Sequence, residues 1–370
     1  MKRTAFFLFC LFAGSFVLHA EVVDANVCDV LAKPQSYDGK IVRLKGTVVA
    51  DFERFLISDS NCKTNTPGIW LDYPEGTKAK SGPVAFVQLQ LAANSTGQVT
   101  PVKRDAVTLD RNADFAKFDS SLSTQNKSSG MCLGCARYAV KATLTGRIDS
   151  VAATLIDSDD KGKFIHLEGF GNLNRYPARL VLQSVTEVAP QEIDYSKAAS
   201  ATKGDSVPSG SGDPVAAAHA AAKLFGEGNA AGAMLEQAAA AFGKQGENNG
   251  VTINFGTANE VSKNEDTKGT TDSPDGLLFV CTFDTARLKG SSMSRVIAHV
   301  GSHIADIRSE PHTSTFNLEF RAWQAVVVLA AATAQKTLTV SGGHVLWNAA
   351  WPAADRDKMV EAAIKEIMAD

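Results

Sequence analysis

The chain of 370 residues is long enough for two domains of ordinary size. Its composition, 44% hydrophobic and 21% charged residues, is that of a globular protein. A net charge of −3 argues against a nucleic-acid-binding protein, which would usually be basic, so no nucleic-acid partner is expected.

Residues 1–20 have the pattern of a secretory signal peptide. Lys2 and Arg3 precede the apolar stretch AFFLFCLFAGSFVL, and the small residue Ala20 follows it. The alternative is a membrane anchor, but the stretch is short for a spanning helix and no second one follows. We therefore expect cleavage near Ala20, a secreted or periplasmic location, and no transmembrane segment in the mature chain.

All but one of the six cysteines remain after the predicted cleavage. Because an exported protein meets an oxidising compartment, disulfides are expected, and the preferred pairs are Cys28 with Cys62 and Cys132 with Cys135. Sequence alone leaves the connectivity open. Cys281 lies in the apolar run GLLFVCTF and is interpreted as a buried, inert thiol.

Residues 21–193 contain a series of short strands. After the turn signal at Tyr37–Gly39, Val42, Leu44 and Val48 alternate with polar residues, which predicts a strand with one buried face. Further strands are predicted in RFLISD, GIWLDYP, VAFVQLQL, RYAVKATLTGRIDS and ARLVLQSVTEV. The arrangement L-x-x-P-x-x-Y-D-G-K-x-V-x-L-x-G-x-V resembles the opening of small OB-like β-barrels in exported bacterial proteins. This resemblance covers about residues 27–188.

The aromatic residues of the barrel region have two interpretations. OB-folds often bind single-stranded nucleic acid or sugars through aromatic side chains on one face. The aromatic residues could form such a platform or fill the barrel interior, and the mild negative charge favours the interior. They are Phe52, Phe55, Trp70, Tyr73 and Phe86.

Residues 194–213 form a predicted flexible linker, because they are rich in Ser, Gly and Ala and contain few large apolar residues. Residues 214–370 are predicted to form a helix-rich α+β domain. It begins with two alanine-rich helices and continues with strands in GVTINF and GLLFVCTF. The predicted fold class is therefore α+β with two domains.

One predicted helix of the second domain carries two histidines. In SSMSRVIAHVGSHIADIR, residues 291–308, apolar residues recur at spacings of three and four, which is typical of an amphipathic helix. His299 and His303 lie four residues apart on one face, the spacing at which two imidazoles bind one zinc ion. The alternative is that both histidines are ordinary packing or surface residues.

A third candidate ligand lies on the next predicted helix. Glu319 sits beside Phe320 and Trp323 on an apolar stripe, so its carboxylate needs a partner. A metal ion shared with the two histidines would supply that partner. An arginine, Arg295 or Arg321, would do so equally.

The segments AHVGSHIAD and LEFRAWQ together resemble the core of gluzincin-type zinc metallopeptidases, over about residues 277–335. The resemblance implies a zincin-like domain in which His299, His303 and Glu319 bind zinc. In that family the residue after the first histidine is the catalytic glutamate. Here it is Val300, which cannot accept a proton, so a degenerate metallopeptidase without a catalytic residue at that position is expected.

Three functional hypotheses follow from the sequence. The first is a non-catalytic exported protein that binds an unknown peptide, protein or cell-envelope ligand and retains zinc. The second is an active zinc hydrolase in which Glu310, or a residue outside the helix, replaces the missing base. The third is a structural or adaptor protein that binds its ligand through the OB-like barrel.

Overall fold

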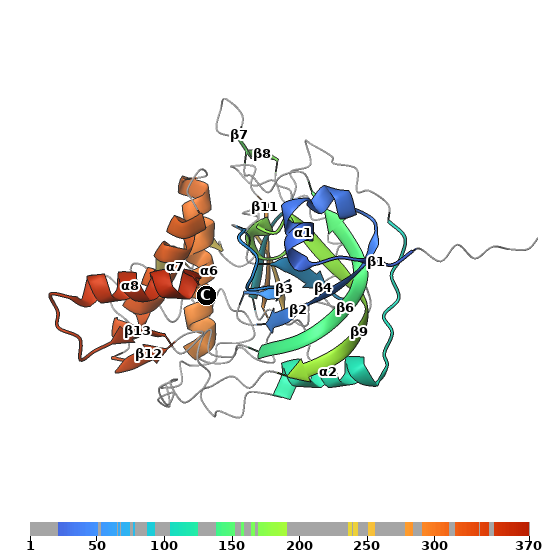
Figure 1. The fold of residues 1–370 in the computed structure, drawn as a ribbon. Coiled ribbons are helices and arrows are strands. Elements are labelled where there is room, and N and C mark those ends of the chain that lie inside the picture. The colour runs from blue at the N-terminus through green and yellow to red at the C-terminus, as the bar shows by residue number, and fades with distance from the viewer. Residues whose placement is uncertain are drawn as a thin grey trace, which may run out of the picture.

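The computed structural model describes the elements drawn in colour in Figure 1. Apart from gaps of one or two residues, it describes residues 21–77, 87–92, 104–124, 138–151, 157–158, 164–166, 169–190, 236–242, 251–255, 278–283, 291–310, 315–339 and 344–369. The predicted signal peptide and linker lie outside the described residues, and so do Cys132 and Cys135.

Five strands of the N-terminal half form a closed barrel. Their order is β2, β3, β4, β9 and β6, and β6 pairs with β2 to close the ring. The β4–β9 pair is parallel and the other four pairs are antiparallel. The strands are β2 (Ile41–Ala50), β3 (Phe55–Ser58), β4 (Ile69–Asp72), β6 (Tyr138–Ser150) and β9 (Ala178–Pro190). The predicted barrel is thus confirmed as a five-stranded one.

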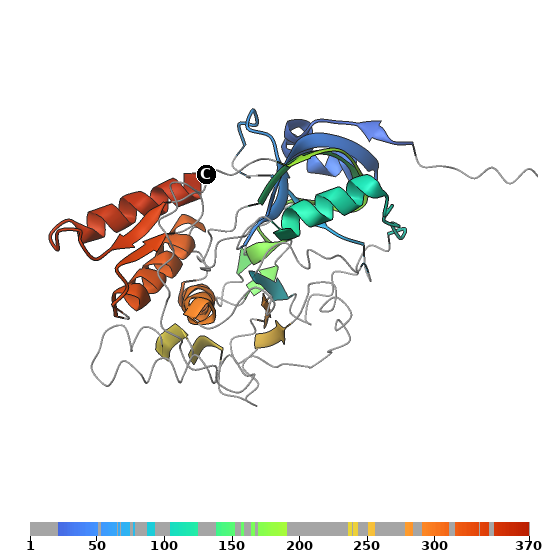
Figure 2. The same ribbon diagram turned by 90° about the horizontal axis from the view of Figure 1, so that it is seen from below.

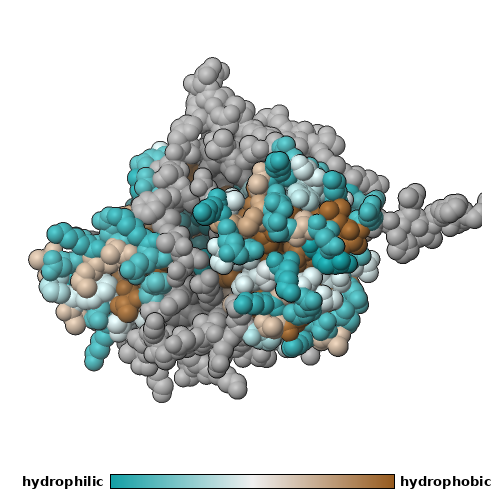
Figure 3. Space-filling view, in the orientation of Figure 1, coloured by the Kyte–Doolittle hydropathy of each residue, from teal (hydrophilic) through white to brown (hydrophobic). Residues whose placement is uncertain are grey.

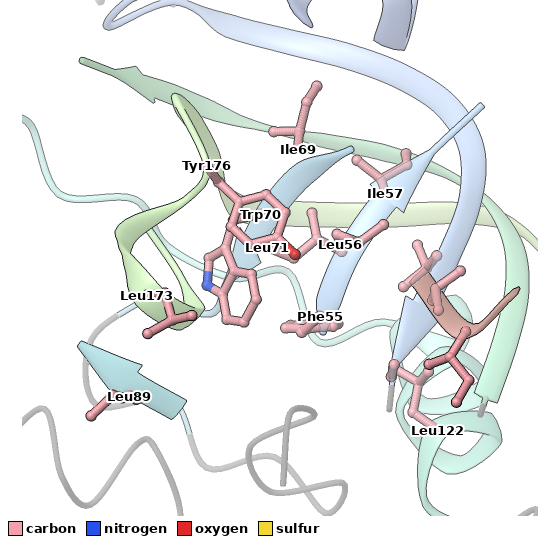
Figure 4. Packing of buried hydrophobic residues seen from close by; sticks show 14 of the residues in the cluster. Phe55, Leu56, Ile57, Ile69, Trp70, Leu71, Leu89, Leu122, Leu173 and Tyr176 are labelled. Atoms are coloured by element: carbon pink, nitrogen blue, oxygen red, sulfur yellow. The ribbon is translucent and has the colours of Figure 1, made fainter. Parts of the chain in front are cut away.

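The barrel closes around the apolar side chains that alternate along its strands. In β2, Val42 and Leu44 are fully buried while Arg43 between them is exposed, as period-two alternation predicts. Ile57 and Ile69 pair across β3 and β4 on this inner face. On the opposite face of β4, the rings of Trp70 and Tyr176 pack with centroids 5.1 Å apart (Figure 4).

The aromatic residues of the barrel region that the structure describes are buried or half-buried. Phe55 and Trp70 are buried and Tyr73 is half-buried, whereas Phe52 and Phe86 lie outside the described residues. Among the described residues, burial therefore removes Phe55 and Trp70 from any exposed aromatic platform.

Short elements cover the outside of the barrel. Strand β1 (Val23–Asp24), helix α1 (Val27–Ala32) and the 3-10 helix η1 (Pro34–Tyr37) precede β2. Cys28 of α1 forms a disulfide with Cys62 in the loop after β3, which confirms one of the two predicted pairs. Helix α2 (Ala113–Thr124), which was not predicted, packs against β6 and β9 through buried side chains such as Phe118.

A second sheet joins distant parts of the chain. Strand β5 (Val87–Ala92) pairs antiparallel with β11 (Leu278–Phe283), and β11 pairs in parallel with β10 (Val251–Phe255). The sequence predicts β5 as a strand of the barrel region, and the structure corrects this prediction. Alternation predicts a strand but does not identify its partner, which here comes from the C-terminal half.

The C-terminal half consists mainly of helices. Helices α6 (Ser291–Ser309) and α7 (Thr315–Ala332) pack against each other, and they lie on one side of the barrel in both ribbon views (Figures 1 and 2). A hairpin of β12 (Thr337–Thr339) and β13 (Val345–Asn348) precedes helix α8 (Arg356–Ala369). Trp347 of β13 is buried and donates a hydrogen bond to the Gln335 carbonyl, so it packs this region.

The remaining described elements are two short strands, β7 (Asp157–Ser158) and β8 (Phe164–His166), and the 3-10 helix η2 (Asn172–Asn174). Hydrophilic residues cover much of the described surface, with smaller hydrophobic areas between them (Figure 3). Among the described residues, no helix combines the length and the apolar character needed to span a lipid bilayer.

Candidate metal centre

Helix α6 supplies two fully buried histidines. His299 and His303 have no exposed surface, and their Nε2 atoms lie 3.1 Å apart. The four-residue spacing puts both imidazoles on the same helix face, one turn apart, with their rings nearly perpendicular. The apolar stripe of α6, which includes the fully buried Val300, anchors the helix in the core. The predicted helix, residues 291–308, is confirmed.

Helix α7 brings Glu319 to the two imidazoles. Its Oε2 atom lies 3.7 Å from His299 Nε2 and 3.9 Å from His303 Nε2, and the residue is 5% exposed. Trp323, one turn later on α7, packs its indole against the His299 ring with centroids 4.6 Å apart. The three residues that the sequence analysis grouped therefore meet at one place.

The barrel contributes the fourth member of the cluster, the acidic residue Glu53, for which the sequence gives no sign. This residue lies between β2 and β3 and is 7% exposed. Its Oε1 atom is 3.2 Å from His299 Nε2 and 3.9 Å from His303 Nε2. A single acidic residue between two strands carries no sequence signal of its own, because helices far along the chain create its burial.

A second barrel residue, Arg175, reaches the same place from the segment after η2. Its Nη1 atom donates a hydrogen bond of 2.8 Å to Glu319 Oε1. Burial alone would lower the pKa of Arg175, but attraction to Glu319, Tyr176 and Glu53 outweighs burial and raises that pKa. The arginine expected beside Glu319 was Arg295 or Arg321; instead Arg321 pairs with Asp306 and Glu310.

Burial keeps both imidazoles neutral. Burial is the main cause that lowers the pKa of His299 to about 4 and that of His303 to about 3. Glu319 opposes this shift, and the positive charge of Arg175 contributes to it. At neutral pH each ring therefore lacks the second proton. A metal ion binds the neutral form of histidine, so the two rings are in the state that metal binding requires.

The arrangement of the four groups fits a metal ion. Ligand atoms from Glu53, His299, His303 and Glu319 all lie within 4.8 Å of one another. Donors about 2.0–2.1 Å from a tetrahedral zinc ion are separated by about 3.3 Å. The two histidine Nε2 atoms are 3.1 Å apart, and their distances to the carboxylate oxygens are 3.2, 3.7, 3.9 and 3.9 Å. This buried group could hold a metal ion.

The other candidate residues lie elsewhere or outside the described residues. Val300, at the position of the catalytic glutamate in the resembled family, points into the apolar core with no exposure. Glu310, the alternative base, is half-exposed and pairs with Arg321 at 2.9 Å. Cys281 is a buried free thiol, as expected, and burial raises its pKa far above the ordinary range.

Comparison of the chain with protein-family models, with curated proteins and with solved structures finds no match.

Proposed function

We propose that this protein is an exported metal-binding protein that holds one divalent transition-metal ion between Glu53, His299, His303 and Glu319. The observation that carries the proposal is the meeting of four donor atoms within 4.8 Å, all from buried residues. Two imidazole nitrogens and two carboxylate oxygens suit zinc better than magnesium or calcium, which prefer oxygen ligands alone. Zinc is therefore the proposed ion.

The proposed centre is non-catalytic. Structural zinc sites are closed by four protein ligands, whereas catalytic sites keep one position for water or substrate. With Glu53 as the fourth ligand, no position remains open, and the buried Val300 cannot replace the missing base. The metal would instead fasten α6 and α7 to the barrel. The protein's external ligand, a peptide, another protein or a cell-envelope component, would bind elsewhere.

The barrel and the His/Glu cluster also support a proposal about the ancestry of the two parts of the chain. A five-stranded barrel is the architecture of the OB-fold, which supports an OB-like N-terminal domain. Two histidines on one helix and a glutamate on the next support descent from gluzincins.

The Cys28–Cys62 disulfide favours an oxidising compartment, in line with export. Mass spectrometry of the exported protein should find Glu21 at the N-terminus; a mature chain that keeps residues 1–20 would contradict this.

The direct test is zinc binding by the metal-depleted protein. Titration against a chromogenic chelator should show one equivalent of zinc per chain. Loss of one imidazole in His303→Ala should weaken binding by about a hundredfold or more, since even changes behind the ligands cost 10–100-fold. His344→Ala is the matched control, because His344 pairs with Glu366 and is no member of the cluster. Absence of zinc uptake by the wild type would overturn the proposal.

A second candidate function is an active zinc hydrolase in which Glu53 is the general base. The observation that favours it is the position of the Glu53 carboxylate, 3.2 Å from His299 Nε2 but on a segment outside the helix. In that case three protein ligands would remain and the carboxylate would serve proton transfer.

The substitution Glu53→Gln separates the two roles. If Glu53 is a ligand, as we propose, the variant should bind zinc at least tenfold more weakly. If Glu53 is a base, the variant should retain its zinc and lose about two to four orders of magnitude of peptide or cell-wall hydrolysis. Chelator-sensitive hydrolysis by the wild type would support the second candidate, and zinc-loaded but inert wild type would exclude it.

A further inference from the structure

The two oxygens of the Glu319 carboxylate have different partners, one of which is Arg175. Its Nη1 atom binds Glu319 Oε1 at 2.8 Å, whereas Oε2 faces the imidazoles of His299 and His303. The ion pair is mostly buried, with side-chain exposures of 26% for Arg175 and 7% for Glu319. Hydrogen bonds between such charged groups are stronger than neutral ones, so this one fixes the rotation of the carboxylate.

The segment that carries Arg175 is shaped by unusual backbone conformations. Leu173 and Asn174 have φ angles of 54° and 51°, in the left-handed region that residues other than glycine rarely adopt. Such conformations persist only where the surrounding structure enforces them, and they cluster at functional sites. The buried Asn172 side chain supplies part of this enforcement, because its Oδ1 atom accepts a 2.7 Å hydrogen bond from the Leu89 N–H of β5.

A glycine packed against Trp70 of the barrel wall further restricts the backbone of this segment. Gly171 has a φ angle of 69°, and a Cβ atom there would lie 2.3 Å from the Trp70 indole. Phe170 and Tyr176 close the segment through two reciprocal backbone hydrogen bonds of 2.9 and 3.2 Å. Contacts with Trp70 of β4 and with β5, together with the Phe170–Tyr176 bonds, therefore set the position of Arg175.

An arginine hydrogen bond to one carboxylate oxygen turns that oxygen toward the arginine and favours metal binding through the other oxygen alone. Four ligands that each give one atom make a four-coordinate shell, the usual geometry of zinc. A carboxylate free to bind through both oxygens would raise the coordination number and favour ions such as manganese or calcium. The residue behind the ligand thereby influences which metal is bound.

We propose that Arg175 is a positioning residue that holds Glu319 as a single-oxygen ligand and so sets a four-coordinate, zinc-selective centre. This inference rests on the proposed function. It adds the metal selectivity of the same site and the residue that determines it.

Cobalt(II) is the probe for this inference, because its visible absorption is intense in four-coordinate sites and weak in six-coordinate ones. The wild type loaded with one equivalent of cobalt should show the intense spectrum. Arg175→Met should retain cobalt with a weaker spectrum and lose about 10–100-fold in zinc affinity, with manganese affinity unchanged or higher. Arg175→Lys keeps one charged hydrogen-bond donor. It should therefore recover part of the intense cobalt spectrum and part of the zinc affinity.

The matched control is Arg321→Met, which removes an arginine from α7 whose pairs are Asp306 and Glu310. Its cobalt spectrum and zinc affinity should equal those of the wild type. A weak, six-coordinate spectrum of the wild type would overturn the inference without any variant, even if Arg175→Met fails to fold. A wild-type spectrum and zinc affinity in Arg175→Met would overturn it as well. Failure of the wild type to bind either metal would instead overturn the proposed function.

Discussion

The two histidines of α6 illustrate how burial at the residue scale prepares a site. Each imidazole is fully buried, and burial makes the protonated ring unfavourable. The same burial that would make an isolated charge costly therefore supplies two neutral nitrogen donors. The carboxylates of Glu53 and Glu319 contribute oxygen donors beside these nitrogens, and an ionised carboxylate attracts a cation.

The depressed pKa values of His299 and His303 give the metal-free protein a defined pH dependence. Below pH 6.5 the unfolded state binds protons that the folded state does not, because the folded pKa values are about 4 and 3. The free energy of unfolding should therefore fall as the pH drops from about 6.5 to 4, by up to about 1.4 kcal/mol per pH unit for each histidine.

Urea unfolding of the chelated protein at several pH values measures this slope. The double variant His299→Ala/His303→Ala should show a shallower slope over the same window, whereas His344→Ala should keep the wild-type slope. An identical slope in the double variant would contradict the assignment of the pH dependence to this pair.

A second residue-scale prediction concerns Asp149 in the barrel wall. Its side chain is 2% exposed and binds Arg147 at 2.6 Å, Arg179 at 3.0 Å and Arg104 at 3.3 Å. Asp149→Ala leaves these arginines with less compensating charge and should lower the free energy of unfolding by about 3–5 kcal/mol. The control Asp24→Ala, at an exposed pair with Arg43, should cost no more than about 1 kcal/mol. Equal effects in urea unfolding would contradict the account.

At the scale of elements, α6 packs closely against the helical segment around Ala238. A Cβ atom at Gly301 would lie 2.3 Å from the Ala238 carbonyl oxygen, so glycine is required there by space. Arg308 reinforces the contact by donating a 3.0 Å hydrogen bond to the Ala241 carbonyl. Gly301 lies between the two histidines in sequence but on the opposite face of the helix. The close contact on that face therefore sets the rotation of α6 that turns the histidines toward α7 and Glu53.

The substitution Gly301→Ala tests this contact. In an exposed helix, replacing glycine by alanine stabilises by about 1 kcal/mol, but the clash here should instead lower the free energy of unfolding by about 1–3 kcal/mol. Gln324→Ala, at an exposed position of α7, should stay within about 0.5 kcal/mol of the wild type. A variant Gly301→Ala that is as stable as the wild type would show that α6 does not need this approach.

Element types were predictable from the sequence because their periodicity is local. Alternation in β2 and the three- and four-residue spacing in α6 each follow from one buried face. Partners were not predictable in the same way. The pairing of β5 with β11, and the arrival of Glu53 and Arg175 beside α7, depend on contacts between remote segments. Three of the four clustered residues could therefore be proposed from helix spacing and resemblance, and the fourth could not.

At the scale of the whole molecule, the described contacts cross the predicted boundary between the two domains. The β5–β11 pairing joins backbone segments, and the Arg175–Glu319 ion pair joins side chains. The division into residues 21–193 and 214–370 stays a prediction. The proposed ligands come from both sides of that boundary, so a bound metal ion would link the two parts.

Metal removal should consequently weaken the whole molecule. An ion that binds only the folded state stabilises it by about 4 kcal/mol when its free concentration is a thousand times Kd. A chelator should therefore lower the midpoint of thermal unfolding of the zinc-loaded wild type. His303→Ala should start at the lower midpoint and show no further change with chelator. An unaltered wild-type midpoint would contradict a metal link between barrel and helices.

The central claim is that one ion occupies the space between Glu53 of the barrel and the three ligands of α6 and α7. Anomalous diffraction from crystals of the zinc-loaded protein, recorded on both sides of the zinc absorption edge, tests it most directly. The account predicts one strong peak about 2 Å from Glu53, His299, His303 and Glu319. A zinc-loaded crystal without a peak at these four residues would contradict it.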